Sequence, residues 1–172
     1  MARPGRNSSS DSILSSSRTF FATTKTSMGR HLLQSERNVG LLVDVLRSLV
    51  SERMFYVHDF VIMPDHVHLL MTVGGGMTIE KAMQLIKGRF SYRLAKEFGY
   101  AGEVWQRGFS EVQVMNEKSF EQHCAYIAAN PVKAGLVGSP EEYPYCYNSL
   151  ARKKAAGARH LAEVAQGLKP HD

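Results

Sequence analysis

The chain has 172 residues, 44% of them hydrophobic, and carries 21 Lys and Arg against 16 Asp and Glu, a formal net charge of +5. This length fits a single domain with its own core, and no apolar stretch approaches the ~20 residues that cross a bilayer. Cys124 and Cys146 lack the spacing of zinc or redox motifs, so we expect free thiols in a reducing compartment. The N-terminal residues lack the apolar core of a signal peptide, so we expect a cytoplasmic protein. The mild basic excess suggests a polyanionic partner, although ordinary basic proteins share it.

The first half of the chain predicts a leader, a strand, a helix and a hairpin. Residues 1–17 are rich in Ser, Arg and Gly, which predicts a disordered leader. Residues 18–26 predict a strand, and Gly29 ends it. Apolar residues then recur at helical spacing over 35–51, with Ser35 as the N-cap. Residues 54–63 and 66–73 predict two strands joined tightly at Pro64-Asp65.

The second half predicts two further helices and one more strand. A helix is expected from its N-cap Thr78 to about Phe98, with an apolar stripe on one side and basic residues on the other. Residues 109–115 predict a fourth strand. Residues 118–130 predict a helix that ends before Pro131. The tail over 149–167 is compatible with a short basic helix.

This order of elements predicts an α+β fold of the ferredoxin-like, split β-α-β kind. It has an antiparallel sheet with two helices on one face, followed by a C-terminal helix that carries a tyrosine. We expect one domain over residues 18–150 and a basic tail over 151–172. The fold alone indicates little about function, because many chemistries use it.

Two histidines lie one residue apart within the apolar run FVIMPDHVHLLM of residues 60–71. Strand side chains alternate between faces, so His66 and His68 point to the same side. A lone buried histidine is more often a satisfied core residue than a ligand, but burying two requires partners for four ring nitrogens. The pair is therefore a candidate half of a metal site, and the other half must come from elsewhere.

The third predicted helix places His123, Tyr126 and Asn130 on one stripe, because residues three or four apart share a helix face. The plain alternative is a half-buried Tyr on an amphipathic helix that Asn130 closes. A phenol is a poor nucleophile at pH 7, but a divalent metal polarises a phosphate, orients it and stabilises the developing charge. Tyr126 could then attack a DNA phosphate and keep the DNA end as a phosphotyrosine.

Five phrases of the sequence occur together in the order that a known family shows. They are FVIMPDHVHLLM (60–71), KGRFS (87–91), VWQRGF (104–109), YIAANPVKAGLV (126–137) and EYP (142–144). On these phrases, which span roughly residues 18–150, the chain resembles the REP-associated tyrosine transposases. These belong to the single-tyrosine, IS200-like transposases with a His-hydrophobic-His motif.

The resemblance implies an activity and a set of site residues. His66 and His68 match the ligand pair for Mg²⁺ or Mn²⁺, and Tyr126 matches the nucleophile. Asn130 matches the position of a further polar ligand, often Gln in relatives. The implied substrate is single-stranded DNA beside a hairpin, such as a REP-like palindromic repeat, cut to a 5′-phosphotyrosine and a free 3′-OH. The implied assembly is a monomer or a homodimer, acting on the nucleoid in the cytoplasm.

Further residues are candidates for supporting roles. His123 is a candidate to orient Tyr126 or to assist proton transfer, and His58 is a candidate neighbour of the metal ligands or a plain surface residue. The candidate DNA-binding residues are Lys87, Arg89, Arg93, Trp105, Arg107, Arg152 and Lys153. For Lys87, Arg89 and Arg93 a solvated helix face is at least as good an interpretation. Arg107, in a turn flanked by glycine, is the better candidate for DNA contact, and the basic tail could clamp the hairpin or serve only solubility.

Two other functions compete with a metal-dependent DNA endonuclease and strand transferase. A non-catalytic module that binds single-stranded nucleic acid would use the same topology, with aromatic side chains on an exposed sheet face. A metal-dependent hydrolase of small phosphate compounds would need more carboxylate ligands, for which Asp65 and Glu111 are the obvious candidates.

Overall fold

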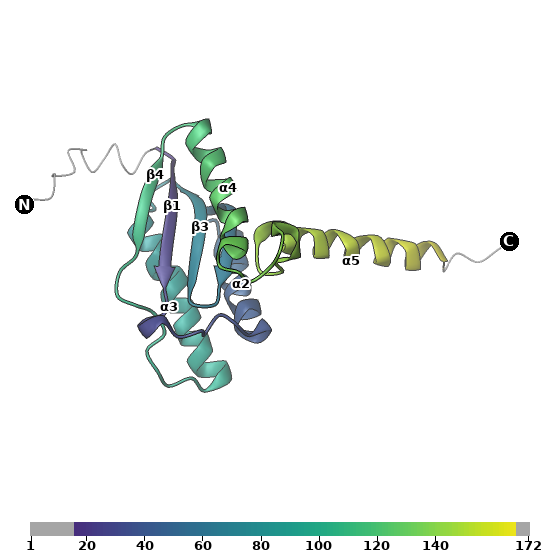
Figure 1. Ribbon diagram of the computed structural model, residues 1–172, viewed down its shortest axis with the longest axis horizontal. Helices are drawn as coiled ribbons and strands as arrows, with labels where there is room; N and C mark the ends of the chain where they lie inside the picture. Colours follow the sequence, from purple (N-terminus) through teal and green to yellow (C-terminus); the bar gives the residue numbers. More distant parts are fainter. Residues whose placement is uncertain (1–15, 168–172) are drawn as a thin grey trace, which may run out of the picture.

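The computed structural model describes residues 16–167 and, within that range, the side chains of residues 16–157. Four strands and four helices follow one another along the chain (Figure 1). The strands are β1 (Arg18–Lys25), β2 (Tyr56–Met63), β3 (His66–Val73) and β4 (Ser110–Val114). The helices are α2 (Glu36–Ser51), α3 (Ile79–Phe98), α4 (Glu117–Lys133) and α5 (Tyr147–Gly167), with short 3₁₀ turns η1 (Ser27–Gly29) and η2 (Pro140–Glu142). Most of the expected leader, residues 1–15, lies outside the described residues.

The four strands form one antiparallel sheet in the order β2-β3-β1-β4. This order and the alternation with helices confirm the predicted α+β class. In β3, which has a neighbour on each side, His66 pairs with Lys25 of β1 and Met63 of β2, and His68 pairs with Thr23 and Val61. The histidine strand is therefore held rigidly in the middle of the sheet.

One face of the sheet carries the main hydrophobic core, and α2 and α3 cover it side by side. Ser35 and Thr78 cap these helices as predicted, because their hydroxyls accept the N–H groups of Asn38 and Lys81. Six fully buried side chains illustrate this core: Leu42, Leu49, Leu69, Met71, Ile86 and Phe90. Burial of this apolar area is the main term that stabilises the fold.

The other face carries α4 and a smaller core. Ile127 and Tyr143 pack there on Val61, Met63 and Leu70. Only Ile127 and Pro131 of α4 are buried, so this helix lies on the sheet with most of its surface exposed. The two histidines belong to this second face.

The prediction that the third helix ends before Pro131 is wrong. The helix runs through the buried Pro131 to Lys133, and the N–H of Ala134 still donates to the carbonyl of Asn130 at 3.0 Å. Proline removes its own N–H but not the carbonyls around it. The chain turns away from the helix axis two residues after Lys133, at Gly135, whose φ of +74° favours glycine and whose N–H donates to the carbonyl of Val132.

The other expected boundaries differ by a few residues at strand and helix ends, where patterns are least informative. β1 ends at Lys25, β2 begins at Tyr56, and β4 covers Ser110–Val114. α5 begins at Tyr147, before the expected start of a tail at residue 151, and it is longer than the short helix expected there.

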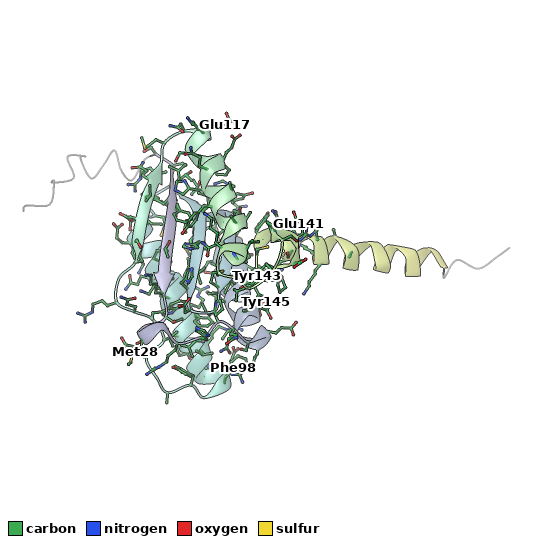
Figure 2. All side chains as sticks on the ribbon, in the orientation of Figure 1. Met28, Phe98, Glu117, Glu141, Tyr143 and Tyr145 are labelled. Carbon is green, nitrogen blue, oxygen red and sulfur yellow. The ribbon has the colours of Figure 1, made fainter. Side chains whose placement is uncertain are left out.

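α5 projects away from the rest of the molecule (Figure 1). Its base is fixed to the edge strand β2, because the Tyr143 hydroxyl donates to the Ile62 carbonyl at 2.6 Å and the Ile62 N–H donates to the Tyr145 carbonyl at 2.9 Å. Figure 2 marks both tyrosines where α5 leaves the body. Within residues 16–167, no helix is long and apolar enough to span a membrane.

Candidate functional site

His66 and His68 point to the same side of β3, as the alternation of strand side chains predicts, and their ring centroids lie 4.8 Å apart. His68 is 6% exposed and lies beneath α4, whereas His66 is half-buried at the start of the strand. The two imidazoles are therefore neighbours on the sheet face that α4 covers.

Each histidine uses its Nδ1 atom for a hydrogen bond and directs Nε2 elsewhere. His66 Nδ1 lies 2.6 Å from the Asp65 carboxylate, and His68 Nδ1 lies 2.7 Å from the Thr23 hydroxyl. An oxygen partner at Nδ1 favours the tautomer that leaves a lone pair on Nε2. Metal-binding histidines in proteins are usually oriented in this way.

The buried histidine is neutral near pH 7. Burial, followed by the positive charges of His66 and Lys25, lowers the pKa of His68 to about 4. A neutral imidazole is the form that binds a metal, because protonation would occupy the lone pair of Nε2.

α4 brings Tyr126 and Asn130 to the histidines. Asn116 caps the helix by accepting the Ser119 N–H, and the four-residue spacing puts Tyr126 and Asn130 on one face. The Asn130 amide nitrogen lies 3.3 Å from His68 Nε2, and an amide turned about its last bond would present its oxygen there. The Tyr126 ring lies 5.4 Å from the His68 ring, and the side chain is 43% exposed. The phenol is thus reachable from solvent beside the buried histidine.

Phe21 of β1 supports the cluster from below. Its ring stacks on His68 at 5.3 Å, meets the edge of Tyr126 at 5.8 Å and packs on His123 at 4.6 Å. His123 Nδ1 lies 2.7 Å from the Ser119 carbonyl oxygen, one turn earlier in α4. His123 therefore shares Phe21 with Tyr126, and its predicted role in orienting that tyrosine would run through Phe21.

Two lysines lie around this cluster. The Lys133 ammonium is 5.6 Å from the centroid of the Tyr126 ring. Lys25 pairs with His66 across the strands and contributes to the lowered pKa of His68. Both place positive charge beside the phenol and the histidines, which favours an anionic ligand there.

The residues that could hold a metal are His66, His68 and Asn130. Among residues 16–157, no three His, Cys, Asp or Glu side chains are grouped so that they could hold an ion. Asp65 is committed to His66, and Glu111 pairs with Ala22 on the opposite face of the sheet. His58 of β2 lies away from these ligands. Its Nε2 is 2.6 Å from the hydroxyl of Thr72, which is six residues along β3 from His66, and its ring packs on Phe120.

The basic residues of α3 lie on the other side of the sheet from Tyr126, because α3 packs on the opposite face. Arg89 forms a two-point ion pair with Glu52, and Arg93 pairs with Glu97. The Lys87 ammonium donates to the carbonyls of Gln106 and Gly108. The structure therefore gives all three a structural partner and does not bring them to the tyrosine.

Trp105 is part of the main core. It is 7% exposed, its indole N–H donates to the Lys87 carbonyl, and its ring packs on Phe90. Little of the indole lies at the surface, and its stacking on a base stays a prediction.

Arg107 and the base of α5 remain open to a ligand. Arg107 is exposed and has no side-chain hydrogen bond or ion pair with another described residue. Its loop is bonded to the end of β1, where the Gln106 N–H donates to the Lys25 carbonyl. Lys153 is exposed, and Arg152 donates to Ser149 and to the Glu141 carbonyl.

Sequence reasoning missed three residues of this site, Phe21, Thr23 and Lys133, and it named Asp65 only as a candidate carboxylate ligand. Strand pairing alone brings Phe21 and Thr23 beside His68, so no local pattern marks them. Asp65 directly precedes His66, and a carboxylate beside a candidate ligand is a usable signal. Lys133 lies seven residues after Tyr126, about two helical turns, but the helix was expected to end before it.

Comparison with known proteins identifies the family. The model of the family described as "Transposase IS200 like" matches residues 22–130, which include the histidine pair, Tyr126 and Asn130. This match covers more than half of the chain, so the chain belongs to the IS200-like transposase family.

Individual relatives agree with this assignment. A REP-associated tyrosine transposase of Escherichia coli (strain K12) is 27% identical over 122 residues, 70% of this chain and 64% of that protein. A Haemophilus influenzae relative is 32% identical over 94 residues, 49% of this chain and 53% of its own length. The chain thus spans between half and two thirds of these curated relatives.

A solved structure resembles the fold over most of its length. It is a REP-associated tyrosine transposase bound to a REP hairpin, with a TM-score of 0.66 and 26% identity, and the match covers 89% of this chain and 82% of that one. A Deinococcus radiodurans crystal structure, at 20% identity and a TM-score of 0.50, shares the fold.

Proposed function

We propose that this protein is a metal-dependent single-stranded DNA endonuclease and strand transferase that cuts beside hairpin repeats through a 5′-phosphotyrosine on Tyr126. The observation that carries the proposal is the meeting of His66, His68 and Asn130 from β3 and α4 beside the solvent-reachable phenol of Tyr126. Membership of the IS200-like transposases supports the same activity.

The donor set of the site fits a divalent metal. Both Nδ1 atoms are occupied by oxygen partners and His68 is neutral near pH 7, so two Nε2 lone pairs and one amide oxygen are available. This set leaves room in an ion's coordination for water and phosphate oxygens, which suits Mg²⁺ or Mn²⁺ at a nucleic-acid phosphate. A bound ion would polarise the scissile phosphate and stabilise its developing charge.

The residues of this chain supply the nucleophile and hold the phosphate. The Tyr126 oxygen attacks the phosphorus and loses its proton to solvent as the new O–P bond forms. The bond from phosphorus to the 3′ oxygen breaks, and that oxygen takes a proton to become a free 3′-OH. The DNA then carries a 5′-phosphotyrosine, which a 3′-OH can attack in the reverse direction to join strands. Lys133 and Lys25 place positive charge around this phosphate.

The substrate we propose is an imperfect hairpin in single-stranded DNA, such as a REP-like palindromic repeat. The structural relative bound to a REP hairpin supports this choice. Exposed Arg107, Arg152 and Lys153 are the candidates for phosphate contacts. Action on the nucleoid in the cytoplasm, as a monomer or a homodimer, completes the proposal.

Two observations count against the competing functions. On the sheet face that would stack bases in a non-catalytic binding module, α4 packs on β2 and β3, and Phe21 of β1 meets Tyr126 of that helix. A hydrolase of small phosphate compounds would need Glu111 at the site, but that carboxylate is on the other face of the sheet.

The proposal is tested with labelled stem-loop oligonucleotides that carry unpaired flanks, incubated with Mn²⁺, with Mg²⁺ or with EDTA and resolved on denaturing gels. Wild-type protein should cut one strand in the presence of metal, and His68→Ala should not cut it at any metal concentration. Tyr92→Phe is the matched control for Tyr126→Phe, because Tyr92 is an exposed tyrosine on α3. The Tyr92→Phe variant should cut at the wild-type rate. Tight binding with no cleavage under any condition would favour the binding module.

A further inference from the structure

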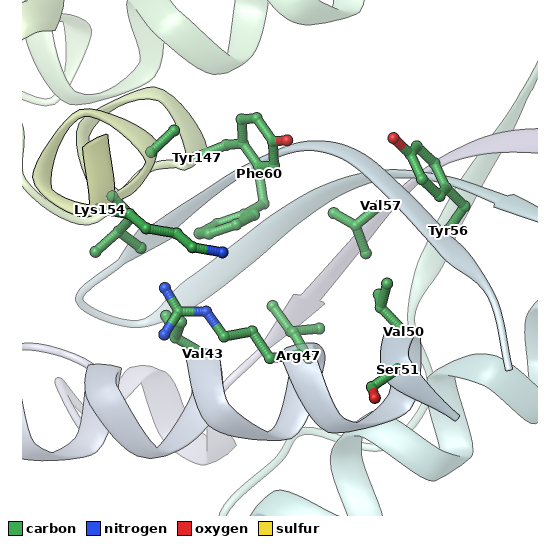
Figure 3. Close-up of a pocket in the computed structure, with 12 residues that line it drawn as sticks. Val43, Arg47, Val50, Ser51, Tyr56, Val57, Phe60, Tyr147 and Lys154 are labelled. Atoms are coloured by element: carbon green, nitrogen blue, oxygen red, sulfur yellow. The ribbon is translucent and has the colours of Figure 1, made fainter. Parts of the chain in front are cut away.

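A cavity of about 440 Å³ opens at the outer edge of the sheet, between α2, β2 and the first turns of α5 (Figure 3). None of its lining residues belongs to the Tyr126 cluster. Its volume lies in the range of pockets that bind small molecules. The family assignment and the proposed chemistry leave this cavity without a role.

Two cations face the opening of this cavity. Arg47 reaches in from α2 and Lys154 reaches in from α5 (Figure 3). Both side chains are exposed, and neither has a hydrogen bond or ion pair with a described residue. Among the residues whose side chains the structure describes, no Asp or Glu lines the cavity. Two positive charges that converge without a counter-charge favour an anionic ligand.

The walls of the cavity are apolar and aromatic. Tyr147 is 40% exposed, so its ring presents free surface, whereas the Tyr56 ring at the other end of the cavity packs on His58 with 4.9 Å between the centroids. Tyr147 stands with its edge toward the ring of Phe60, with 6.0 Å between the centroids. Free aromatic faces next to cations are the combination with which proteins bind the bases and phosphates of single strands.

We propose that this cavity binds one unpaired nucleotide of the DNA, with its base against Tyr147 and its phosphate on Arg47 and Lys154. The inference rests on the proposed function, because it assigns a second DNA subsite to the same protein. The base of α5 connects the two places. Arg152 lines a smaller cavity with Ala128 of α4, and Lys154 lines the larger one. The first turns of α5 therefore adjoin both the Tyr126 helix, across a cavity that Asp59 and Glu141 also line, and the larger cavity.

The test uses a stem-loop oligonucleotide with an unpaired flank, and the same stem-loop with an abasic flank that keeps the phosphates. Wild-type protein should bind the abasic form more weakly by about five- to 150-fold, the effect of losing one stacked base. The double variant Arg47→Ala/Lys154→Ala should lose most of this difference, and so should Tyr147→Ala, whereas Tyr147→Phe should keep it.

The charge-matched control is Lys81→Ala/Lys118→Ala, which removes two exposed lysines outside the cavity. It should keep the wild-type response to the abasic flank. As a direct measurement, 5-iododeoxyuridine placed at successive flank positions and irradiated should crosslink to Tyr147 from one position only.

The inference would be overturned if the abasic flank weakened binding equally in Arg47→Ala/Lys154→Ala and in Lys81→Ala/Lys118→Ala. Crosslinks only to peptides outside the cavity would also overturn it. Cleavage at the Tyr126 site is followed in the same samples. If Tyr126 cuts the DNA and the flank bases make no difference, the cavity assignment alone fails. If the protein binds no stem-loop DNA, the proposed function fails with it. A change in oligomeric state in the Arg47 and Lys154 variant, without a change in DNA binding, would assign the cavity to a second copy of the chain.

Discussion

The two faces of the sheet are packed for different purposes. Toward α2 and α3, strands β1 to β3 present mainly apolar side chains such as Phe20, Leu69 and Met71, and these are buried. Toward α4, the same strands present His66, His68 and Thr23, and α4 buries only Ile127 and Pro131 against them. One face therefore holds most of the apolar burial that stabilises the fold, while the other keeps polar groups near solvent at modest cost in burial.

The contrast teaches why the site can be both rigid and accessible. The histidines stand on a central strand that neighbours fix on both sides, so their positions follow from the stable face. Tyr126 stands on a helix with little buried surface, which leaves its phenol open to a polymer as large as DNA. The two faces should therefore respond differently to substitution: one in stability, the other in activity.

The largest expected effect is on the exposed phenol. Tyr126→Phe should abolish strand cleavage, a loss of at least about a thousandfold, because it removes the attacking oxygen. The free energy of unfolding of this variant should remain within about 0.5 kcal/mol of wild type, because the ring of residue 126 keeps its contacts. Gel assays together with calorimetry measure both. Retained cleavage would reject Tyr126 as the nucleophile.

The reverse pattern is expected on the stable face. Phe90→Ala should lower the free energy of unfolding by about 3–5 kcal/mol, because Phe90 of α3 is fully buried and packs on Trp105. Denaturant titration measures this loss. Cleavage per folded molecule should stay close to wild type at a temperature where the variant is folded. A small change in stability would contradict the assignment of the main core to this face.

An intermediate effect is expected for the hydrogen bond that orients the buried histidine. Thr23→Val removes the oxygen 2.7 Å from His68 Nδ1. The concentration of Mn²⁺ needed for half-maximal cleavage should rise by about 10- to 100-fold, the usual cost of losing such a partner. Thr19→Val is a control on the same strand face, whose hydroxyl bonds Thr72 and not the histidines. Equal metal requirements for the two variants would reject the orienting role.

A smaller effect separates the second tyrosine of this face from the first. Burial raises the pKa of Tyr143 to about 12, and its hydroxyl donates to the Ile62 carbonyl. The folded state favours the neutral phenol, so this stabilisation is fully present below pH 10 and is lost as the pH rises toward about 12. Tyr143→Phe should cost about 0.5–1.5 kcal/mol at pH 7 and flatten the alkaline loss of stability. An unchanged alkaline profile would contradict this account.

The smallest effect concerns a single phosphate contact. Arg107→Ala should weaken hairpin binding uniformly across sequences and reduce the slope of log K against log salt by about 0.7 to 0.9. Arg89→Ala should leave this slope unchanged, because Arg89 is paired with Glu52 on the far side of the sheet. Filter binding over a salt series compares the two variants. Equal salt slopes for the Arg107→Ala and Arg89→Ala variants would mean that Arg107 does not contact a DNA phosphate.

Local patterns predicted what depends on local chemistry. The caps Ser35 and Thr78, the strand of His66 and His68 and the stripe of Tyr126 and Asn130 follow from periodicity and side-chain hydrogen bonding, and the structure agrees with each. Local pattern did not predict that the histidine pair of β3 meets the Tyr126 and Asn130 stripe of α4, because this contact depends on which face of the sheet α4 packs against. Family resemblance supplied that link.

The differences between expectation and structure have physical causes as well. Trp105 and Lys87 were expected to contact DNA because aromatic and basic residues are common on DNA-binding surfaces. In the structure each has a partner from a distant segment, and their DNA contacts stay a prediction. Helix α4 was expected to stop at Pro131, although its carbonyls still accept bonds from the following turn. In both cases tertiary packing outweighed a local preference.

The most direct test of the central claim is to locate the covalent bond. Wild-type protein is incubated with Mn²⁺ and a stem-loop oligonucleotide, digested with protease and nuclease, and analysed by mass spectrometry. We predict a nucleotide phosphate attached to Tyr126 and absent from the Tyr126→Phe variant, with the released strand ending in a 3′-OH. Metal-dependent cleavage with no adduct on Tyr126, or an adduct on another tyrosine, would contradict the account.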